Sequence, residues 1–416
     1  MSNTATANDV AVIGAGIIGC AVTWALCKTG RRVLLVDRAD PASAGASFGN
    51  VGHIATEQLQ PLPSPQLLLN FWRELVAFDG ALDLPLRRVV TMAPWITGFA
   101  RAAFQQRHNT EYLAPLVRCA ADTLESQLSE IGRRDLLRRN GHYVLWLGRK
   151  ASARASADRA RAAKLGITTR EAPEELLHAT AGACGVWYPS SAHVLDPAMV
   201  ARAFATAATQ AGASIVRTSV RQIRPQGEHI EIVTDTDSLT VSTAVVCAGA
   251  WSPPLLSAFG LHAPLEAERG YHVELPNHAP LTDAPILYAD HSVVVTPMAS
   301  RLRASSYLEF AGLTAPPDAR KPARLRAKLR QLGYKCDIDG PSWMGPRPTL
   351  PDYLPGIGRA PGPHKLFYAV GHQHLGLTLA AVTADLVAEI VTDRTPRFDV
   401  RPFDLKRFGT VARPLR

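Results

Sequence analysis

The 416-residue sequence has only six cysteines, and no two of them stand in a C-x-x-C arrangement. Zinc ribbons and iron–sulfur clusters are usually held by such pairs, so the chain itself encodes neither kind of centre. Long apolar runs are also lacking: glycines interrupt the most apolar stretch, residues 10–26, and no run reaches about 18 residues, so we expect no membrane-spanning helix. The first eight residues are polar and lack the basic region of a signal peptide, which favours a cytoplasmic location.

Acidic residues are fewer than basic ones: 36 Asp and Glu stand against 45 Lys and Arg, a net charge of +9. This surplus suits an anionic cofactor, a carboxylate substrate or an acidic partner, and it also allows peripheral contact with the inner face of a membrane. The basic residues are densest at 133–139 and 321–330, where no aromatic ladder lies between them. We therefore interpret both stretches as solvated helix faces and expect no nucleic-acid binding. With 47% hydrophobic residues, a chain of this length predicts a globular protein of two or three domains.

A glycine-rich turn near the N-terminus carries the clearest motif. An apolar, β-branched stretch runs into Gly14-x-Gly16-x-x-Gly19, a helix-forming stretch follows, and a second apolar stretch ends at Asp37. In a βαβ unit such glycines allow a tight turn close to a pyrophosphate, and free N–H groups at the helix N-terminus bind its oxygens. Asp37 can accept hydrogen bonds from ribose hydroxyls, and an acid here argues against a 2′-phosphate, which leaves NAD or FAD. The alternative is an ordinary glycine-rich turn.

The rest of the chain predicts an α/β protein with a second lobe. Residues 66–183 have a helical composition with one strand-like interruption, and Asp196 followed by Pro197 begins another helix. Strands are predicted at residues 142–146, 214–216, 230–233, 242–248, 271–275 and 292–296, and further helices at 322–332 and 379–391. We therefore predict a Rossmann-type domain with a parallel sheet and a second domain with a mostly antiparallel sheet.

The C-terminal quarter carries motifs that extend this interpretation. Residues 343–352 read Trp-Met-Gly-Pro-Arg-Pro-Thr-Leu-Pro-Asp, and residues 366–378 lead from Leu-Phe-Tyr-Ala-Val-Gly to Gly-Leu-Thr at the start of a helix. Together with residues 46–54 and 248–251, these motifs resemble the D-amino acid oxidase and dehydrogenase superfamily of FAD-dependent oxidoreductases. Residues 371–384 are most similar to enzymes of that superfamily that act on D-proline-type rings, the D-hydroxyproline and D-amino acid dehydrogenases.

The resemblance implies FAD as cofactor and a division of the chain into two domains. A discontinuous FAD-binding domain would comprise residues 1–65, 190–260 and 343–416, and a substrate domain would comprise residues 66–189 and 261–342. Sarcosine oxidase relatives attach their flavin through a cysteine in the segment where this chain has residues 345–349, which contain none. We therefore expect non-covalent FAD.

The resemblance also assigns candidate catalytic residues. Arg347 matches the arginine that pairs with the substrate carboxylate, a role suited to a guanidinium fork; the alternative is that it joins two loops. Tyr271 and Tyr307 are candidates for closing the substrate pocket, with core packing as an equal alternative, and His53 for a place against the flavin.

A larger set is expected at the cofactor, with local turn capping as the alternative for Ser47 and Asn50 and an ordinary sheet position for Val220. The expected cofactor-binding residues are Gly14, Gly16, Ile17, Ile18, Gly19, Asp37, Arg38, Ser47, Asn50, Val51, Gly52, His53, Val220, Gly249, Gly371, His374, Leu375, Gly376, Leu377 and Thr378. His372 and His374 lack a third ligand at metal-binding spacing, so we predict no metal site.

The implied reaction is oxidation of a D-amino or cyclic imino acid to the imine, by hydride transfer to flavin N5. The best-matching substrates are cis-4-hydroxy-D-proline and D-proline. Three alternatives remain open: a D-amino acid dehydrogenase of broad specificity, a flavin-bearing subunit of a multi-chain dehydrogenase, and a nicotinamide-dependent dehydrogenase. Dioxygen, a quinone or a partner subunit could each accept the electrons.

Overall fold

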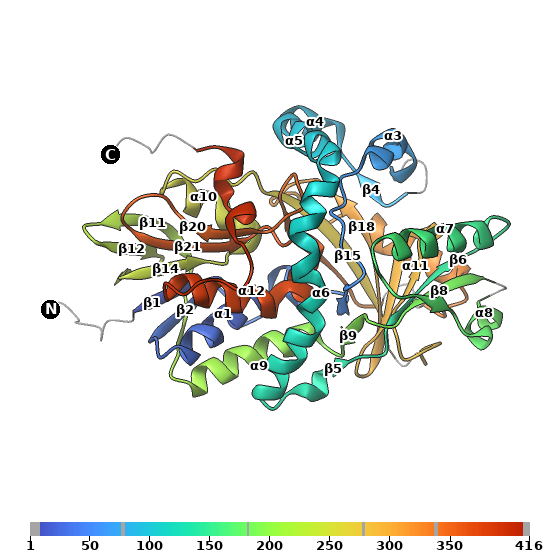
Figure 1. The fold of residues 1–416 in the computed structure, drawn as a ribbon, viewed down its shortest axis with the longest axis horizontal. Coiled ribbons are helices and arrows are strands. Elements are labelled where there is room, and N and C mark those ends of the chain that lie inside the picture. The colour runs from blue at the N-terminus through green and yellow to red at the C-terminus, as the bar shows by residue number, and fades with distance from the viewer. Residues whose placement is uncertain (1–8, 76–79, 181–182, 277–278, 337–339, 411–416) are drawn as a thin grey trace.

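The computed structural model describes residues 9–75, 80–180, 183–276, 279–336 and 340–410, which form two lobes, each built on its own sheet (Figure 1). The sheet of the first lobe consists of β1 (Val10–Ile13), β2 (Val33–Asp37), β10 (Ser214–Arg217), β14 (Thr243–Val246), β20 (Gly356–Arg359) and β21 (Lys365–Val370). Its strand order is β10-β2-β1-β14-β21-β20. All neighbouring pairs are parallel except β20 and β21, which confirms the predicted Rossmann-type sheet.

The first two strands and α1 (Ile17–Lys28) form the predicted βαβ unit. All four residues of β1 are buried, as expected for a central strand in a sheet that is covered on both faces. Val10 lies beside Val33 of β2 and Thr243 of β14. The chain turns at Gly14, so the glycine motif lies at the carboxyl edge of the sheet, where open α/β sheets bind their ligands.

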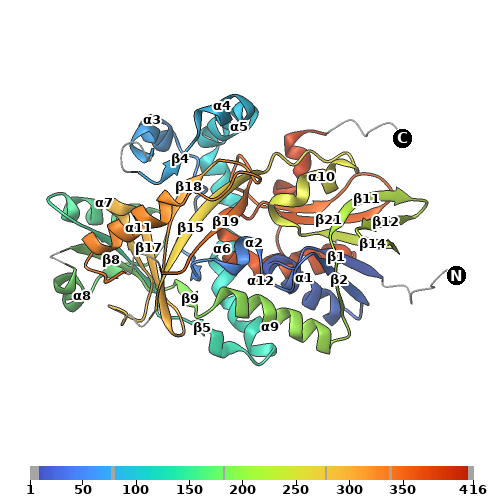
Figure 2. The same cartoon turned by 180° about the vertical axis from the view of Figure 1, so that it is seen from behind.

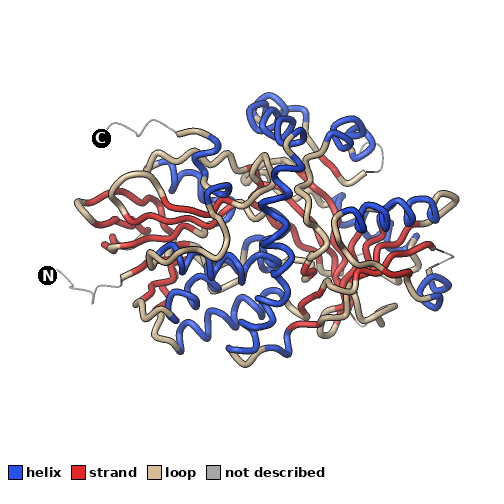
Figure 3. Tube along the Cα trace, viewed as in Figure 1, coloured by secondary structure: helices blue, strands red, loops and turns tan. Residues whose placement is uncertain are grey.

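Helices cover one face of this sheet, and a small antiparallel sheet covers the other (Figure 3). The helical layer consists of α1, α6 (Gln106–Glu130), α9 (Pro197–Gln210) and α12 (Gly376–Val391); the opposite layer consists of β11 (Val220–Gln226), β12 (His229–Thr234), β13 (Ser238–Val241) and α10 (Ser252–Ser257). Asp196 caps α9, because its carboxylate accepts from the N–H groups of Ala198 and Met199, and Pro197 follows in the first turn. This confirms the predicted helix start.

The second lobe is built on a nine-stranded sheet. Its strands are β4 (Leu82–Asp83), β6 (His142–Trp146), β7 (Arg170–Glu171), β8 (Cys184–Tyr188), β15 (Glu266–Pro276), β16 (Ile286–Tyr288), β17 (Val293–Pro297), β18 (Arg301–Glu309) and β19 (Ser342–Thr349). Only the β6–β16 and β4–β18 pairs are parallel, so the predicted mostly antiparallel sheet is confirmed. Leu325 and Leu329 of α11 (Arg320–Gln331) pack into the core of this sheet.

Shorter elements lie between and around the two lobes (Figure 2). They are the helices α2 (Gly45–Phe48), α3 (Pro65–Glu74), α4 (Leu86–Thr91), α5 (Ala93–Phe104), α7 (Ala151–Lys164) and α8 (Glu174–Ala179), and the strands β3 (His53–Ile54), β5 (Leu137–Arg138) and β9 (Ala192–Val194). The last three form a small sheet in the order β3-β9-β5.

Two elements lie across the predicted domain limits. Helix α6 belongs to the range 66–189 expected for the substrate domain, yet its buried residues, among them Leu116, Leu124 and Leu128, share one core with α1 and α12. Strand β19 contains all of residues 343–349, expected in the FAD-binding domain, yet it pairs with β15 of the second sheet. The limits of the two domains therefore stay a prediction.

Helix α12 is apolar over most of its surface, in keeping with its burial. The stretch Gln373–Val391 is long and apolar enough to cross a membrane by length and composition alone, but 72% of it is buried inside the structure. Its apolar residues pack against α1 and α6, and Gln127 of α6 donates to the carbonyl of Ala381 at 3.0 Å. Such packing is that of a core helix.

The basic stretch 321–330 was predicted to be a solvated helix face, but three of its basic residues are buried. It forms α11, in which Lys321, Arg326 and Lys328 are buried. Lys321 Nζ lies 2.5 Å from the carboxylate of Asp83 and 2.7 Å from that of Glu309, both on neighbouring strands. Buried acids outside the helix therefore hold this ammonium group, and helix periodicity alone could not reveal them.

Candidate functional site

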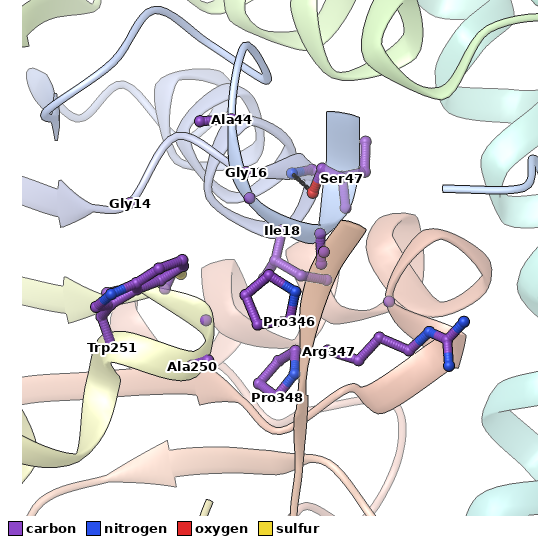
Figure 4. Close-up of a pocket in the computed structure, with 18 of the residues that line it drawn as sticks. Gly14, Gly16, Ile18, Ala44, Ser47, Ala250, Trp251, Pro346, Arg347 and Pro348 are labelled. Atoms are coloured by element: carbon purple, nitrogen blue, oxygen red, sulfur yellow. Dashed lines mark hydrogen bonds between the residues drawn. The ribbon is translucent and has the colours of Figure 1, made fainter. Parts of the chain in front are cut away.

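A cavity of about 390 Å³ lies where the carboxyl edge of the parallel sheet meets the second sheet. The first lobe lines it with the turn after β1, residues 36–51 and the start of α12, and the second lobe lines it with Gly270, Ser305 and Arg347 (Figure 4). A cavity that joins a glycine-rich loop to side chains of a second domain can hold a nucleotide at one end and a small substrate at the other.

The glycine motif forms a tight cradle at one end of this cavity. Gly14 has a φ of +108°, which L side chains rarely adopt, and a Cβ there would overlap the carbonyl oxygen of Cys247. A Cβ on Gly19 would overlap the carbonyl oxygen of Gly14, so Gly19 packs α1 tightly against the turn. Gly16 is the N-cap of α1 and has no side chain that could accept from the first N–H groups of the helix. The cradle thus places a helix N-terminus at the cavity, where N–H groups that have no partner among the described residues can bind an anion.

Asp37 closes the cradle at the end of β2. Its Oδ2 accepts from the N–H of Ala15 at 2.6 Å, and its Oδ1 accepts from Ala39 N–H at 2.9 Å. These bonds fix the carboxylate at the cavity wall, where the predicted ribose contact requires it. The guanidinium of the next residue, Arg38, lies 4.5 Å from the ring of Trp251, and both residues line the cavity.

Helix α2 and the loop that follows it border the cradle. Ser47 Oγ accepts from the N–H of Ile17 at 2.9 Å, so it serves the start of α1 and not its own turn. Asn50 does cap its own turn, because its Oδ1 accepts from Gly52 N–H at 2.7 Å. Gly52 has a φ of +81°, and a Cβ there would lie 2.8 Å from the carbonyl oxygen of Val194.

A second helix N-terminus opens onto the cavity at α12. The chain turns at Gly371, with a φ of +72°, and at Gln373, with a φ of +40°, before α12 begins at Gly376 without a side-chain cap. Burial lowers the pKa of His374, which lines the cavity here, to about 4. A helix N-terminus at this position can stabilise negative charge that develops on a group bound in the cavity. Thr378 lies behind the wall, where its Oγ1 accepts from the N–H of Ala55 at 3.1 Å.

Arg347 lies on β19, and its side chain extends away from Gly14 (Figure 4). Its Nη1 donates to Oε1 of Glu268 at 2.8 Å and to the carbonyl of Tyr307 at 3.3 Å. A Cβ on Gly270 would overlap its Nη2 and Cζ, so the guanidinium lies directly over the backbone of β15. Within the described part of the chain, both hydrogen bonds of Arg347 use Nη1. The Nε–Nη2 edge is therefore the one that can take a carboxylate.

Sequence reasoning missed Glu268, which holds Arg347 in place. This carboxylate is fully buried, and its Oε2 accepts from the hydroxyls of Tyr353 at 2.8 Å and Thr349 at 3.2 Å. Burial, together with the adjacent Glu268 carboxylate, raises the pKa of the Tyr353 hydroxyl well above its usual range, so this hydroxyl remains a donor. The signal in the sequence was a charged residue two positions before Gly270, because a buried charge in a strand needs partners.

Trp343 was noted as part of a motif but not as a site residue. Its indole lines the cavity and stacks on His272, with 5.3 Å between ring centroids. A Cβ on Gly49 or Gly345 would overlap the indole, so glycines make room for it on both sides. The ring therefore lies between Gly49, directly after α2 in the first lobe, and the second sheet.

The two candidate tyrosines lie in packed positions. Tyr271 lines the cavity, but its hydroxyl donates to Glu309 at 2.7 Å and accepts from Arg269 at 3.0 Å. Tyr307, only 3% exposed, packs edge to face on Tyr271 behind the wall, with 6.2 Å between ring centroids. Both placements agree with the core-packing alternative, and a role at the substrate stays a prediction.

His53 also lies behind the wall. It belongs to β3, and its Nε2 is 3.7 Å from Oε2 of Glu57. Its ring lies 4.5 Å from that of His142, and burial lowers the pKa of His53. His374, by contrast, lines the cavity. Its Nε2 lies 2.5 Å from Oε1 of Gln58, the residue after Glu57.

Most predicted site residues meet in this one cavity. Those that line it are Gly14, Gly16, Ile17, Ile18, Asp37, Arg38, Ser47, Asn50, Val51, Val220, Gly249, Tyr271, Arg347, Gly371, His374, Gly376 and Leu377. Those that the structure places behind the wall are Gly19, Gly52, His53, Tyr307, Leu375 and Thr378.

The residues present fit a bound dinucleotide. The glycine cradle and the N-terminus of α1 suit a pyrophosphate, while Asp37 suits a ribose. Of the described cysteines only Cys247 lines the cavity, and burial raises the pKa of its thiol. Non-covalent attachment stays a prediction.

Comparison with known proteins finds a family model and relatives that match most of the chain. The family model of FAD dependent oxidoreductases matches residues 9–390, which include all residues that line the cavity. The chain is 30% identical to a D-amino-acid oxidase of Bradyrhizobium diazoefficiens, with 96% of this chain and 98% of that protein covered. It is 25% identical to a D-amino acid dehydrogenase of Rhizobium johnstonii, with 96% and 100% covered. The crystal structure of glycine oxidase from Geobacillus kaustophilus has the same fold, with a TM-score of 0.74, 22% identity, and 96% and 98% covered.

Proposed function

The chain belongs to the FAD dependent oxidoreductase family, and from this premise we propose that it oxidises a D-amino acid or a cyclic imino acid to the imine. FAD-dependent oxidation of an amino acid follows from the family and its relatives. The configuration and identity of the substrate are our proposal, with cis-4-hydroxy-D-proline or D-proline as first choice.

The position of Arg347 carries this proposal. It lies in the same cavity as the glycine cradle, but on the other lobe, and its Nε–Nη2 edge lies over Gly270. Glu268 and the Tyr307 carbonyl hold Nη1, so the guanidinium is oriented before any substrate arrives. A guanidinium fork that is fixed in this way can bind a carboxylate with two parallel hydrogen bonds.

The reaction removes the Cα hydrogen with its electron pair and a proton from the amine, which leaves a C=N bond. FAD, when bound, supplies the acceptor for the two electrons. The chain would hold FAD with the glycine cradle, Asp37 and the N-terminus of α12. Its own part in the chemistry is to bind the carboxylate at Arg347 and so to orient Cα, an effect that contributes much of the rate in such reactions.

The choice of a ring substrate rests on the similarity of residues 371–384 to enzymes of D-proline-type rings. A broad D-amino acid dehydrogenase is the second candidate, favoured by relatives whose names, D-amino-acid oxidase and D-amino acid dehydrogenase, specify no side chain. Both candidates use the same carboxylate site, so they differ only in what fits beyond Cα.

Anaerobic reduction of the bound flavin tests the proposal. The purified protein is mixed with cis-4-hydroxy-D-proline, D-proline, D-alanine and L-proline, and flavin absorbance is followed. We expect the two D-ring substrates to bleach the flavin fastest and L-proline to leave it oxidised. Fast bleaching by D-alanine would favour the broad dehydrogenase, and a yellow protein that no D-amino acid bleaches would refute both. Arg347→Lys is the matched variant, because a lysine keeps the charge but cannot form the fork.

We also propose that the electron acceptor lies at an anionic membrane surface, where a quinone is available. Leu69 of α3, Leu86 and Val90 of α4 and Phe104 of α5 are 74–88% exposed, and these helices gather at one edge of the second lobe (Figure 1). From residue 84 to residue 110 the chain has four arginines and no acidic residue. Apolar side chains among basic ones are complementary to an anionic bilayer.

Vesicle flotation tests this location. We expect the holoenzyme to float with vesicles of phosphatidylcholine and phosphatidylglycerol and to stay behind with pure phosphatidylcholine. The double variant Leu86→Gln, Val90→Gln should lose most of this binding and keep its flavin. Equal behaviour with both vesicles, or tight dimers formed through the same residues, would overturn the proposal.

A further inference from the structure

A buried polar cluster lies behind the wall of the cavity, at the junction of the two lobes. It consists of His53 on β3, Glu57 in the loop that follows, and His142 on β6 of the second sheet. The side chains are 10%, 10% and 2% exposed, respectively. The three residues come from two distant segments of the chain. The sequence therefore shows no metal-binding spacing for them.

Two ring nitrogens of this cluster form no hydrogen bond with the described residues. His53 Nε2 and His142 Nδ1 are buried and have no hydrogen-bond partner among the described residues. Each lies just beyond hydrogen-bond distance of the Glu57 carboxylate, at 3.7 and 3.8 Å from Oε2. Buried polar groups are almost always paired, so two unpaired nitrogens aimed at one carboxylate indicate a missing partner between them.

The charge of the cluster points to a cation. In the described part of the chain, Glu57 forms ion pairs only with these two histidines, and no lysine or arginine approaches its carboxylate. Its Oε2 accepts one hydrogen bond, from Ser191 Oγ at 2.6 Å. A buried carboxylate without a permanent countercharge is costly, and a bound cation offsets that cost.

From this geometry we infer that His53, Glu57 and His142 bind a divalent metal ion of the zinc class. One ligand atom from each lies within 4.8 Å of the other two. Zn²⁺ takes imidazole nitrogen and carboxylate oxygen at roughly 2.0–2.2 Å, so its ligand atoms stand about 3.5 Å apart. The nitrogen–oxygen distances of 3.7 and 3.8 Å therefore need only a small contraction. His193, which pairs with His53 across β3 and β9, has a further buried nitrogen without a partner and is our candidate for a fourth ligand.

A second cluster of acids shows what a site without a metal looks like. Asp83, Glu309 and Asp318 also bring ligand atoms within 4.8 Å of one another. Lys321 Nζ lies among them, at 2.5, 2.7 and 3.3 Å, so the protein supplies its own cation there. The histidine cluster has no such group among the described residues.

The inferred role of the metal is structural. It would fix the loop after β3, which carries Gln58, to β6 of the second sheet. Gln58 lies 2.5 Å from His374, a residue of the cavity wall, so the metal would hold this wall in register between the two lobes. This inference is independent of the substrate and of the proposed function.

Metal analysis of the untagged holoenzyme tests the inference. After dialysis against a chelator, the protein is reloaded with Zn²⁺ or Co²⁺ and its metal content, visible spectrum and Tm are measured. We expect about one equivalent per chain, the d–d bands of four-coordinate Co²⁺ and a higher Tm with metal than without. Glu57→Gln and His142→Ala should bind less than a tenth of the metal, and their Tm should not respond to it.

The matched control is His108→Ala. His108 and Glu111 have the same 3.7 Å spacing of nitrogen and oxygen, but both side chains are 62% exposed. This variant should keep its metal and its Tm response. A wild-type protein that takes up neither Zn²⁺ nor Co²⁺ would overturn the inference, as would a Glu57→Gln protein that keeps its full metal content.

Discussion

Arg347 donates from Nη1 to the fully buried carboxylate of Glu268 at 2.8 Å, across the pair of strands β15 and β19. This bond fixes one nitrogen of the guanidinium and leaves the opposite edge over Gly270. It also compensates part of the charge of the arginine. A substrate carboxylate bound here, as proposed, would meet a well-oriented guanidinium whose charge is partly compensated.

Glu268→Gln should strengthen binding of the substrate carboxylate. The amide keeps an acceptor for Nη1, but the charge of the Arg347–Glu268 pair rises from zero to +1. We expect the KM for the amino acid to fall about fivefold or more, since a unit charge close to a partly buried site changes the binding free energy of an ion by about 1 kcal/mol or more. Steady-state kinetics measures this. Glu266→Gln, on the same strand but paired with Arg88, is the control and should leave KM unchanged. A raised KM in Glu268→Gln would contradict the prediction.

Gly270→Ala should displace the arginine without disturbing the cofactor. The new Cβ would overlap the guanidinium of Arg347, and no other atom is as close. We expect KM to rise about tenfold or more, with normal flavin content and Tm, because the fork loses its aligned position. In a double-mutant cycle, Arg347→Lys should add little to the effect of Gly270→Ala. Fully additive effects would show that the two residues act separately.

The cofactor cradle could be predicted from sequence, whereas the substrate end could not. Gly14, Gly16 and Asp37 lie within one βαβ unit, so their meeting follows from local geometry. Glu268 and Arg347 meet only because β15 and β19 pair in one register, and single-sequence reasoning does not give that register. The burial of Lys321 was hidden for the same reason, because its acidic partners lie on other strands. Contacts between distant strands are thus the part that the sequence pattern leaves open.

Gly14→Ala should yield protein with little or no flavin. The residue has a φ of +108°, and its Cβ would overlap the backbone of Cys247, so the turn must open. We expect flavin content, measured by the ratio of visible to ultraviolet absorbance, to fall about tenfold or more. Gly30→Ala is the matched control: its φ of +80° brings similar strain, but no atom lies near its Cβ. If both variants lose flavin equally, backbone strain and not the cradle is responsible.

The loss of stability on acidification should depend in part on Asp318. Its carboxylate accepts from Arg320 at 2.9 Å and lies 3.3 Å from Lys321 Nζ, and these contacts, Arg320 first, hold the pKa of Asp318 well below its usual range. A group whose pKa is lowered by folding stabilises the protein above its unfolded pKa of about 4 and loses that effect as the pH falls through its folded pKa.

Asp318→Asn should therefore lower the free energy of unfolding at pH 7 modestly, by about 1 kcal/mol or less, because the Asp318 side chain is partly exposed. Urea midpoints between pH 7 and pH 3 measure the difference between wild type and variant. That difference should shrink as the pH falls below 4, and a gap that widens toward low pH would show that another group controls the acid transition.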